Sequence, residues 1–136
     1  MNDNSNDPSM AHTINTAPGR LAVVRIADLP GDTSARDFVG ADHGGLPVSL
    51  IVIDHQPGDG PDLHEHDYAE VIVVIEGEMT ITDGETTVVV TAGEIAIAPA
   101  RRPHAFKNTG SSHLRSIDIH THPEFVTRWH DTTEPG

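Results

Sequence analysis

The feature of this sequence that most constrains its fold is a series of short runs of β-branched and apolar residues separated by glycine-containing turns. Such runs are typical of β-strands, and no segment shows the longer period of an amphipathic helix. The Asp83-Gly84 pair between two runs predicts a hairpin, because both turn residues must tolerate positive φ. The predicted strands are residues 47–54, 71–76, 78–82, 86–90, 94–98 and 114–120, with a further one at 21–26. This spacing predicts an all-β barrel or sandwich.

The remaining segments have the composition of loops and tails. Residues 1–19 are polar and predict a flexible N-terminal arm, which leaves residues 20–136 as a single β-barrel domain. The stretches 29–37 and 55–62 are interpreted as loops, because glycine, proline and aspartate dominate them. Residues 123–131 fit either a helical turn or a short strand.

Charge and composition exclude several classes of function. Aspartate and glutamate number 21 against 8 for lysine and arginine, a formal net charge of -13. A nucleic-acid surface needs clustered cations, so the sequence argues against nucleic acid and against an anionic membrane as partners. The chain has no cysteine, which excludes disulfides, thiolate nucleophiles and iron–sulfur clusters. It has no signal-like start and no apolar run of membrane-spanning length, so we expect a soluble, cytoplasmic protein.

Two predicted strands are apolar on both faces. Residues 71–75 and 51–53 do not alternate, whereas a sheet with one solvated face should. One face would fill the barrel, and a second subunit is the simplest cover for the other. We therefore expect a homodimer; coverage by the N-terminal segment or the tail is the alternative.

Histidines and a glutamate occur at the spacing of metal ligands. His64 and His66 are separated by one residue, so both imidazoles project from the same face of an extended backbone. Glu70 follows in phase at the entrance to the next strand, and His104 is a fourth candidate after the 94–98 strand. Imidazoles and a carboxylate that converge suit a divalent transition metal. The alternative is that these residues are ordinary surface or hydrogen-bonded core histidines.

The same residues carry a family resemblance. The first cupin motif is matched by Gly58, His64, His66, Glu70 and Gly77. The second is matched by Gly93, Pro99, His104 and Asn108, with Arg101 where the family usually has a glycine. The sequence thus resembles the small single-domain bacterial cupins over about residues 45–120. The resemblance implies a jelly-roll-like β-barrel with one metal bound by His64, His66, Glu70 and His104.

The ligand set does not select the metal. Three imidazoles and one carboxylate suit iron, manganese, nickel, cobalt, copper or zinc. On an octahedral ion two positions would stay open for substrate or dioxygen, whereas a tetrahedral zinc would be saturated.

Other polar residues have two interpretations each. Tyr68 is a candidate catalytic proton donor or enolate stabiliser, or else a tyrosine at the barrel rim. Asp118, His120 and His122 share one face of the last strand, which lies either in the pocket or in solvent. Arg101 and Arg102 either pair with a carboxylate substrate or are ordinary exposed arginines. No role is assigned to His12, His43, His55, His113 and His130.

Two functions are compatible with these features. The first is a metal-dependent enzyme acting on a small organic molecule, of dioxygenase, isomerase, cyclase or lyase type, with the metal as Lewis acid or oxygen-activating centre. Ile72 and Val74 are in phase with Glu70 and predict an apolar pocket wall, which favours a compact organic acid, ketone or phenol over a sugar. The second is a metal-containing barrel that binds or senses a small molecule without turnover.

Overall fold

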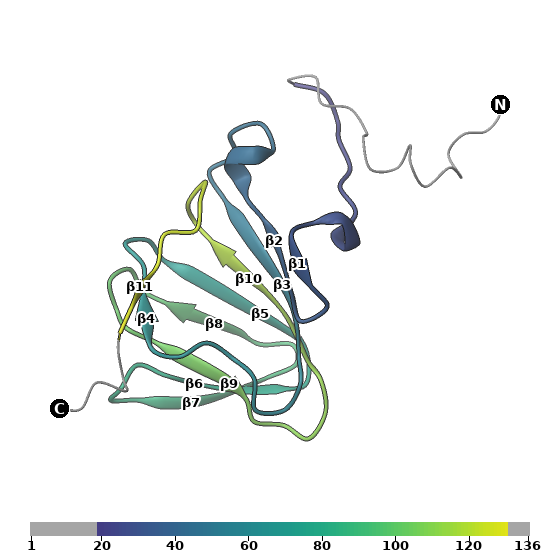
Figure 1. Ribbon diagram of the computed structural model, residues 1–136. Helices are drawn as coiled ribbons and strands as arrows, with labels where there is room; N and C mark the ends of the chain where they lie inside the picture. The colour runs from purple at the N-terminus through teal and green to yellow at the C-terminus, as the bar shows by residue number, and fades with distance from the viewer. Residues whose placement is uncertain (1–18, 131–136) are drawn as a thin grey trace.

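Antiparallel sheets are the main regular structure of residues 19–130, the part of the chain that the computed structural model describes (Figure 1). The strands are β1 (Gly31–Asp32), β2 (Ala35–Phe38), β3 (Ser49–His55), β4 (His64–Glu65), β5 (Glu70–Glu76), β6 (Glu78–Thr82), β7 (Thr87–Thr91), β8 (Ile95–Ala98), β9 (Ala105–Asn108), β10 (Leu114–His120) and β11 (Arg128–Trp129). The helical elements are two short 3-10 turns, η2 (Ile26–Asp28) and η3 (Gly40–Asp42). The predicted all-β fold is confirmed.

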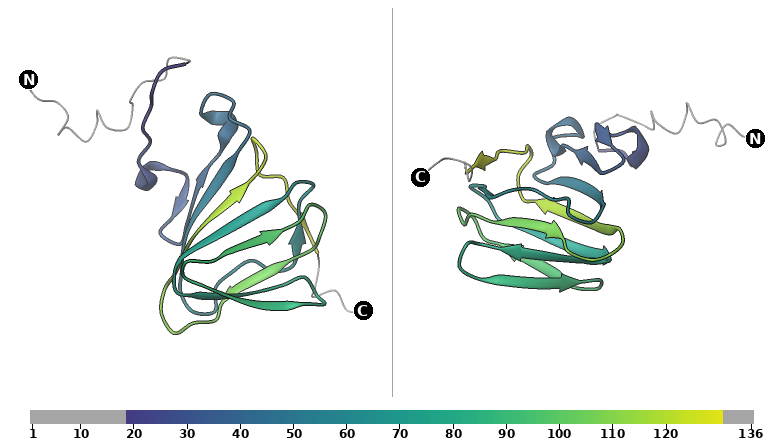
Figure 2. Two further views of the ribbon diagram at one scale, coloured as in Figure 1. Left: turned by 180° about the vertical axis from the view of Figure 1, so that it is seen from behind. Right: turned by 60° about the horizontal axis from the view of Figure 1, so that its bottom comes forward.

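The strands are distributed over two main sheets that face each other (Figure 2). The larger has the order β1-β2-β3-β10-β5-β8, the smaller has the order β7-β6-β9, and β4 pairs with β11 at one side (Figure 1). Because successive side chains of a strand point to opposite faces, alternate residues of each sheet enter the space between them. That interior contains both the apolar core and the polar cluster described below.

The register of β5 against β10 divides the interior into two ends. Glu70 lies opposite His120, and Val74 lies opposite Ser116, so the polar residues of the two strands meet at one end. The apolar core gathers around the other end and consists of Ile72, Val74, Met79, Val90, Phe106 and Leu114. The core thus closes one half of the interior and leaves the polar half for a site.

Glycine-containing turns determine where the chain passes from one sheet to the other and where it forms a hairpin. Gly77 joins β5 of the large sheet to β6 of the small one with φ 88°, and a Cβ there would lie 2.4 Å from the carbonyl oxygen of His113. The predicted hairpin at Asp83-Gly84 is confirmed: β6 pairs with β7, and Asp83 Oδ1 accepts the backbone N–H groups of Glu85 and Thr86.

Two predictions near the N-terminus are wrong. Residues 21–26 form no strand, and Ile26 begins η2 instead. β-Branched residues make a strand only beside a partner, and the edge next to β2 is occupied by β1. The segment 29–37 is not all loop, since Ala35–Phe38 forms β2 and pairs with β3. Its polar composition concealed a strand near the edge of the sheet.

At the other end of the chain, the strand alternative for residues 123–131 is correct for Arg128–Trp129, which pairs with β4. The short strands β4 and β9 were not predicted. The predicted N-terminal arm falls almost wholly in residues 1–18, which lie outside the described residues.

The outer face of the large sheet is apolar, as the two-sided pattern predicted. Ile95 and Ile97 of β8 are 60% and 70% exposed, and they lie opposite Val73 and Val71 of β5. The described part of the tail does not cover this face, because it runs beside β4 (Figure 1). No helix within residues 19–130 has the length and apolarity needed to cross a membrane.

Candidate metal centre

Three histidines and one glutamate converge in the polar half of the interior. One donor atom from each of His64, His66, Glu70 and His104 lies within 4.8 Å of the other three, and all four residues are buried. The backbone brings them together: His64 and His104 exchange N–H···O bonds of 2.9 and 2.8 Å, and Glu70 begins β5. The spacing predicted this convergence correctly.

The outer nitrogen of each imidazole is held by the backbone. Nδ1 of His64 lies 2.7 Å from the carbonyl oxygen of Asp62, and Nδ1 of His104 lies 3.1 Å from that of Arg102. Nδ1 of His66 lies 2.9 Å from the carbonyl oxygen of Val126. A carbonyl oxygen only accepts, so each Nδ1 carries the proton and, in a neutral ring, each Nε2 presents a lone pair. This is the arrangement of metal-binding histidines.

The inner nitrogens face a carboxylate rather than a donor. Nε2 of His66 and Nε2 of His104 each lie 3.1 Å from Glu70 Oε1. The His66 contact lacks hydrogen-bond geometry, and its Nε2 is one of two buried side-chain N or O atoms without a hydrogen-bond partner in residues 19–130. Lone pairs that face a carboxylate repel each other unless a proton or a cation lies between them. The donor set therefore fits a divalent metal ion.

Burial and the mutual contacts set the charges of these groups. Burial lowers the pKa of His64 to about 4, so this imidazole is neutral near neutral pH. Burial opposes ionisation of Glu70, but the contacts of its carboxylate with the imidazoles of His104, His120 and His66 outweigh burial and lower its pKa. Burial also works against a charged His104, yet the bond to Glu70 gives this residue a net raised pKa. The carboxylate is thus ionised and available as a ligand.

His120 extends the cluster by one residue. It is buried on β10, with Nε2 3.5 Å from Glu70 Oε2 and Nδ1 2.7 Å from the Tyr68 hydroxyl. The open question about the last strand is thereby answered: Asp118 and His120 face the interior, whereas His122 is partly exposed and stacks on Tyr68. The sequence showed that successive side chains of this strand point to opposite faces of the sheet. Only the pairing of β10 with β3 and β5 shows which of the two faces is inside.

Tyr68 is buried against the cluster and not at an open rim. Its ring stacks on His66 at 4.9 Å, and its hydroxyl also accepts the backbone N–H of Val126 at 3.2 Å. Burial raises the pKa of Tyr68, so the hydroxyl keeps its proton.

The C-terminal segment, residues 123–130, covers the cluster. β11 pairs with β4, and Trp129 packs on His64 at 4.9 Å between ring centroids. Arg128 fastens the segment through ion pairs of 2.8 Å with both Glu65 and Asp67. Sequence reasoning gave this segment no part in the site.

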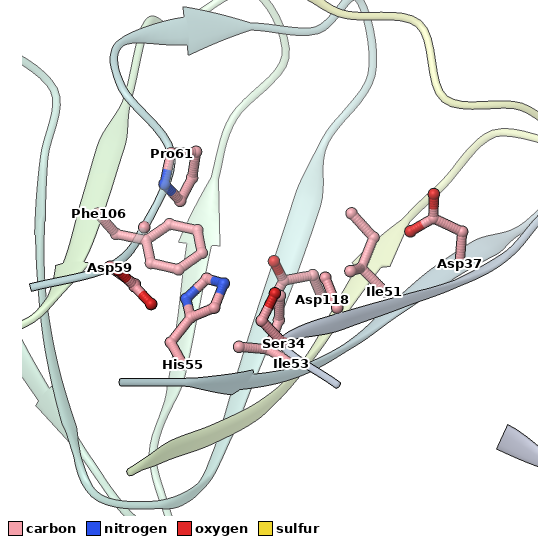
Figure 3. Close-up of a pocket in the computed structure, with 11 residues that line it drawn as sticks. Ser34, Asp37, Ile51, Ile53, His55, Asp59, Pro61, Phe106 and Asp118 are labelled. Atoms are coloured by element: carbon pink, nitrogen blue, oxygen red, sulfur yellow. The ribbon is translucent and has the colours of Figure 1, made fainter. Parts of the chain in front are cut away.

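The structure also has a cavity of about 340 Å³, whose lining contains none of the four cluster residues (Figure 3). Its walls come from β2, β3, β9, β10 and the loop before β4, and its lining includes Ile51, Ile53, His55, Phe106 and Asp118. Asp118 of the cavity lining lies two residues before His120 on β10, and burial and the nearby charge of Glu70 both raise its pKa. The cavity lining contains neither Ile72 nor Val74, so the apolar wall expected from them is instead supplied by β3 and Phe106.

The two arginines behave differently. Arg102 forms ion pairs with Asp83 at 2.9 Å and with Glu85 at 3.2 Å, so its guanidinium group is bound to carboxylates at the surface. Arg101 has φ 59°, the left-handed conformation that glycine would adopt freely, and its N–H bonds the carbonyl oxygen of His66 at 2.6 Å. The turn therefore keeps the glycine conformation although the residue is arginine.

Of the histidines without an assigned role, one was missed. His55 is buried and lines the cavity. His43 stacks on Phe38, His113 contacts Asp54, and His130 contacts Glu65, all away from the cluster. His12 lies outside the described residues. The signal that was available for His55 is its place in the alternation Ser49, Ile51, Ile53 of β3.

Several solved structures have a fold similar to that of this chain. The oxalate decarboxylase of Lactobacillus farciminis, as its formate complex, is similar with a TM-score of 0.64 and 17% identity, over 76% of this chain and 34% of that chain. A cupin-like protein of Thermotoga maritima is similar with a TM-score of 0.63 and 16% identity, over 71% and 74%. A protein of Klebsiella pneumoniae with a double-stranded β-helix domain is similar with a TM-score of 0.62 and 17% identity, over 79% of this chain and 96% of that chain.

At these identities the likeness shows a shared fold, and this chain spans about a third of the oxalate decarboxylase. No curated protein matches the sequence of this chain. The sequence pattern of the family described as "Cupin domain" matches residues 51–120, just over half of the chain, and the chain therefore belongs to the cupin family.

Proposed function

We propose that this cupin is a metal-dependent enzyme that acts on a small organic molecule. The observation that carries the proposal is the convergence of three imidazole Nε2 atoms and one carboxylate, with every Nδ1 tied to a backbone carbonyl. A divalent ion held by His64, His66, Glu70 and His104 would supply Lewis acidity or oxygen activation. The reaction type is a dioxygenation, isomerisation, cyclisation or elimination, and the metal is iron, manganese, nickel, cobalt, copper or zinc.

The residues around the ligands have supporting parts in this proposal. Tyr68, His120 and Glu70 form a continuous line of polar contacts, so Tyr68 would give its proton to Nδ1 of His120 as His120 releases its Nε2 proton on the Glu70 side to the substrate. The C-terminal segment excludes water from one side of the cluster, and the cavity on the other side accommodates the substrate. Tyr68 is therefore the proposed proton donor.

A second candidate function is binding without turnover. It is favoured by the coverage of the cluster, since His64, His66, Glu70 and His104 are each at most 5% exposed. A closed site limits exchange of substrate and product, whereas it suits retention of a metal and a ligand.

The metal content of untagged protein, purified without chelator or immobilised metal, tests the proposal. We expect close to one metal ion per chain by elemental analysis. His66→Ala and His104→Ala should weaken metal affinity by more than about 100-fold, because loss of an outer hydrogen-bond partner alone costs about 10–100-fold. His113→Ala, which removes a surface imidazole, is the matched control and should keep the metal.

The outcomes separate the candidates. Folded wild-type protein without metal above background would contradict both. Iron would direct assays to oxygen consumption with catechols and diketones, and zinc, nickel or manganese to isomerisation and elimination. A bound metal with a small-molecule ligand, and no turnover in either set of assays, would favour the binding function.

Two further features belong to this proposal. Residues 20–136 act as one domain, because a single interior serves both core and site. The outer face of the large sheet pairs with a second subunit to form a homodimer, because Ile95 and Ile97 are exposed there beside an apolar sheet.

A further inference from the structure

The cavity beside the metal cluster has the size and the walls of a small-molecule pocket. Its volume of about 340 Å³ lies near the small end of the range of about 300–1,000 Å³ that is typical of ligand sites. Ile51 and Ile53 of β3 form one apolar side, and Phe106 of β9 and Pro61 form the other. Such walls suit a compact apolar body such as a single ring.

One polar atom in this cavity lacks a partner. His55 is 9% exposed, and its Nδ1 is buried without a hydrogen bond in the described part of the chain. The imidazole lies among the lining side chains, next to the ring of Phe106 (Figure 3). Because this nitrogen has no exposed surface, a ligand would reach it only after the imidazole turns toward the cavity, and the hydrogen bond formed then would recover the free energy that the unpaired nitrogen costs.

The cavity reaches the metal cluster through Asp118. This residue lies two positions before His120 on β10, which is about 7 Å along a strand. His120 in turn contacts Glu70, so Asp118 and His120 connect the cavity lining to the metal ligands, none of which lines the cavity itself.

The cavity lining contains carboxyl groups and no side chain with a fixed positive charge, and the exposed Asp59 is its clearest negative charge because burial raises the pKa of both Asp37 and Asp118. Asp37, Asp59 and Asp118 line the cavity, and no lysine or arginine is among the lining residues. The ammonium group of Lys107 is close enough to influence His55, but it is already bonded to the carbonyl oxygen of Gly60 and to Asp62. An anionic ligand would lose its hydration here with no cation to replace it.

We propose that the substrate of this site is an uncharged molecule with an apolar ring-sized body and one hydroxyl or carbonyl group, which bonds to His55, and that the pocket rejects carboxylate anions. This inference rests on the proposed function for the role of the pocket, but the charge preference follows from the pocket alone. It narrows the expectation from the sequence, since it keeps ketones and phenols and removes organic acids.

A charge series of one-ring probes tests the inference. Benzyl alcohol, benzoate and benzylamine would be titrated into full-length protein, as purified and after metal removal, with amide shifts in residues 51–55 and 105–108 as the readout. We expect benzyl alcohol to bind in both forms, with a Kd at least about tenfold lower than that of benzoate in the metal-free form. Tighter binding of benzoate or of benzylamine, or no binding of benzyl alcohol, would overturn the proposal.

Single substitutions test whether Asp59 and His55 determine which of these probes bind. Asp59 is exposed at the rim, so Asp59→Lys should improve benzoate binding at least about fivefold and leave benzyl alcohol within about twofold. Asp42→Lys makes the same charge change outside the cavity lining and should alter neither. His55→Leu should weaken benzyl alcohol by about 5–10-fold while toluene, which has no hydroxyl, binds as before.

The two proposals fail in different ways. Absence of metal from the purified protein would contradict the metal-dependent function. The relative affinities of benzyl alcohol, benzoate and benzylamine could still be measured. Unchanged benzoate affinity in Asp59→Lys, or equal loss of toluene and benzyl alcohol in His55→Leu, would contradict the pocket inference while the metal remained.

Discussion

At the scale of single residues, the site depends on groups whose contacts lie far away in sequence. Nδ1 of His66 is held by the carbonyl oxygen of Val126, and Tyr68 is bonded to His120. Two residues there are also held in costly states: Arg101 in a left-handed conformation, and Asp118 as a fully buried carboxyl. Both can be tested by substitution.

Arg101→Gly should raise the free energy of unfolding. A non-glycine residue at φ 59° costs about 1–2 kcal/mol, and glycine removes this cost at the expense of about 0.5–1 kcal/mol of backbone entropy. We expect a net gain of up to about 1 kcal/mol by urea denaturation. Arg101→Ala is the control: it removes the guanidinium but keeps the strained backbone, so it should bring no gain. A larger loss for glycine than for alanine would contradict this account.

Asp118→Asn should stabilise metal-free protein increasingly as pH rises. Burial and Glu70 raise the folded-state pKa of Asp118 above its ordinary value of 3.8. Between these two pKa values the folded state binds more protons than the unfolded state, so its stability falls with rising pH by up to about 1.4 kcal/mol per pH unit. Asparagine does not ionise, so the variant does not lose stability in this way as pH rises. Urea denaturation at pH 5 and pH 7.5 measures the free energies of unfolding of the variant and the wild type. A gap between variant and wild type that is the same at both pH values would refute the prediction.

At the scale of elements, turns between the sheets determine whether the ligands meet. Gly77 places β6 in the small sheet while β5 stays in the large one, and the β5–β10 register then sets Glu70 opposite His120. Two glycines with similar positive φ separate the effect of strain from that of crowding: Gly77 at 88° and Gly84 at 93°.

Gly84→Ala should cost about 1–2 kcal/mol, because only the left-handed backbone opposes the substitution and no atom lies within 4 Å of the new Cβ. Gly77→Ala should cost at least about 2 kcal/mol more, because its Cβ would also lie 2.4 Å from the carbonyl oxygen of His113. Urea denaturation of the two variants gives the comparison. Equal losses would mean that the β5–β6 corner relaxes without difficulty.

At the scale of the whole molecule, the interior is divided between an apolar end that stabilises the fold and a polar end that forms the site. The outer face of the large sheet adds a third region, with exposed isoleucines on β8. Soluble monomers rarely leave such a face uncovered, which is why we expect a dimer.

Ile97→Asp should convert the dimer to a monomer, because a carboxylate would be buried without a partner at the centre of an apolar interface. Val89→Asp is the control, since Val89 is similarly exposed but lies on β7 of the other sheet. Analytical ultracentrifugation of both variants and wild type distinguishes the states. A monomeric wild type, or a monomeric Val89→Asp, would contradict the proposed interface.

The sequence by itself determined the all-β fold and the four candidate ligands. Both follow from short-range patterns: β-branched runs between glycine turns, and a spacing that puts His64 and His66 on one face. The sequence-based predictions were wrong for residues 21–26 and for β2. Strand formation depends on whether a neighbouring strand is available for pairing, and the β-propensity of a segment contains no information about that neighbour.

Only the tertiary structure decided which polar residues entered the interior. Alternation places Asp118 and His120 on the same face, but strand pairing decides that this face is inside. The same holds for His55, which the sequence left without a role and which the β3 register turns into the cavity. The carbonyl oxygen that holds His66 belongs to Val126, 60 residues away, so no local pattern encodes this contact, whereas His64 and His104 use carbonyl groups only two residues away.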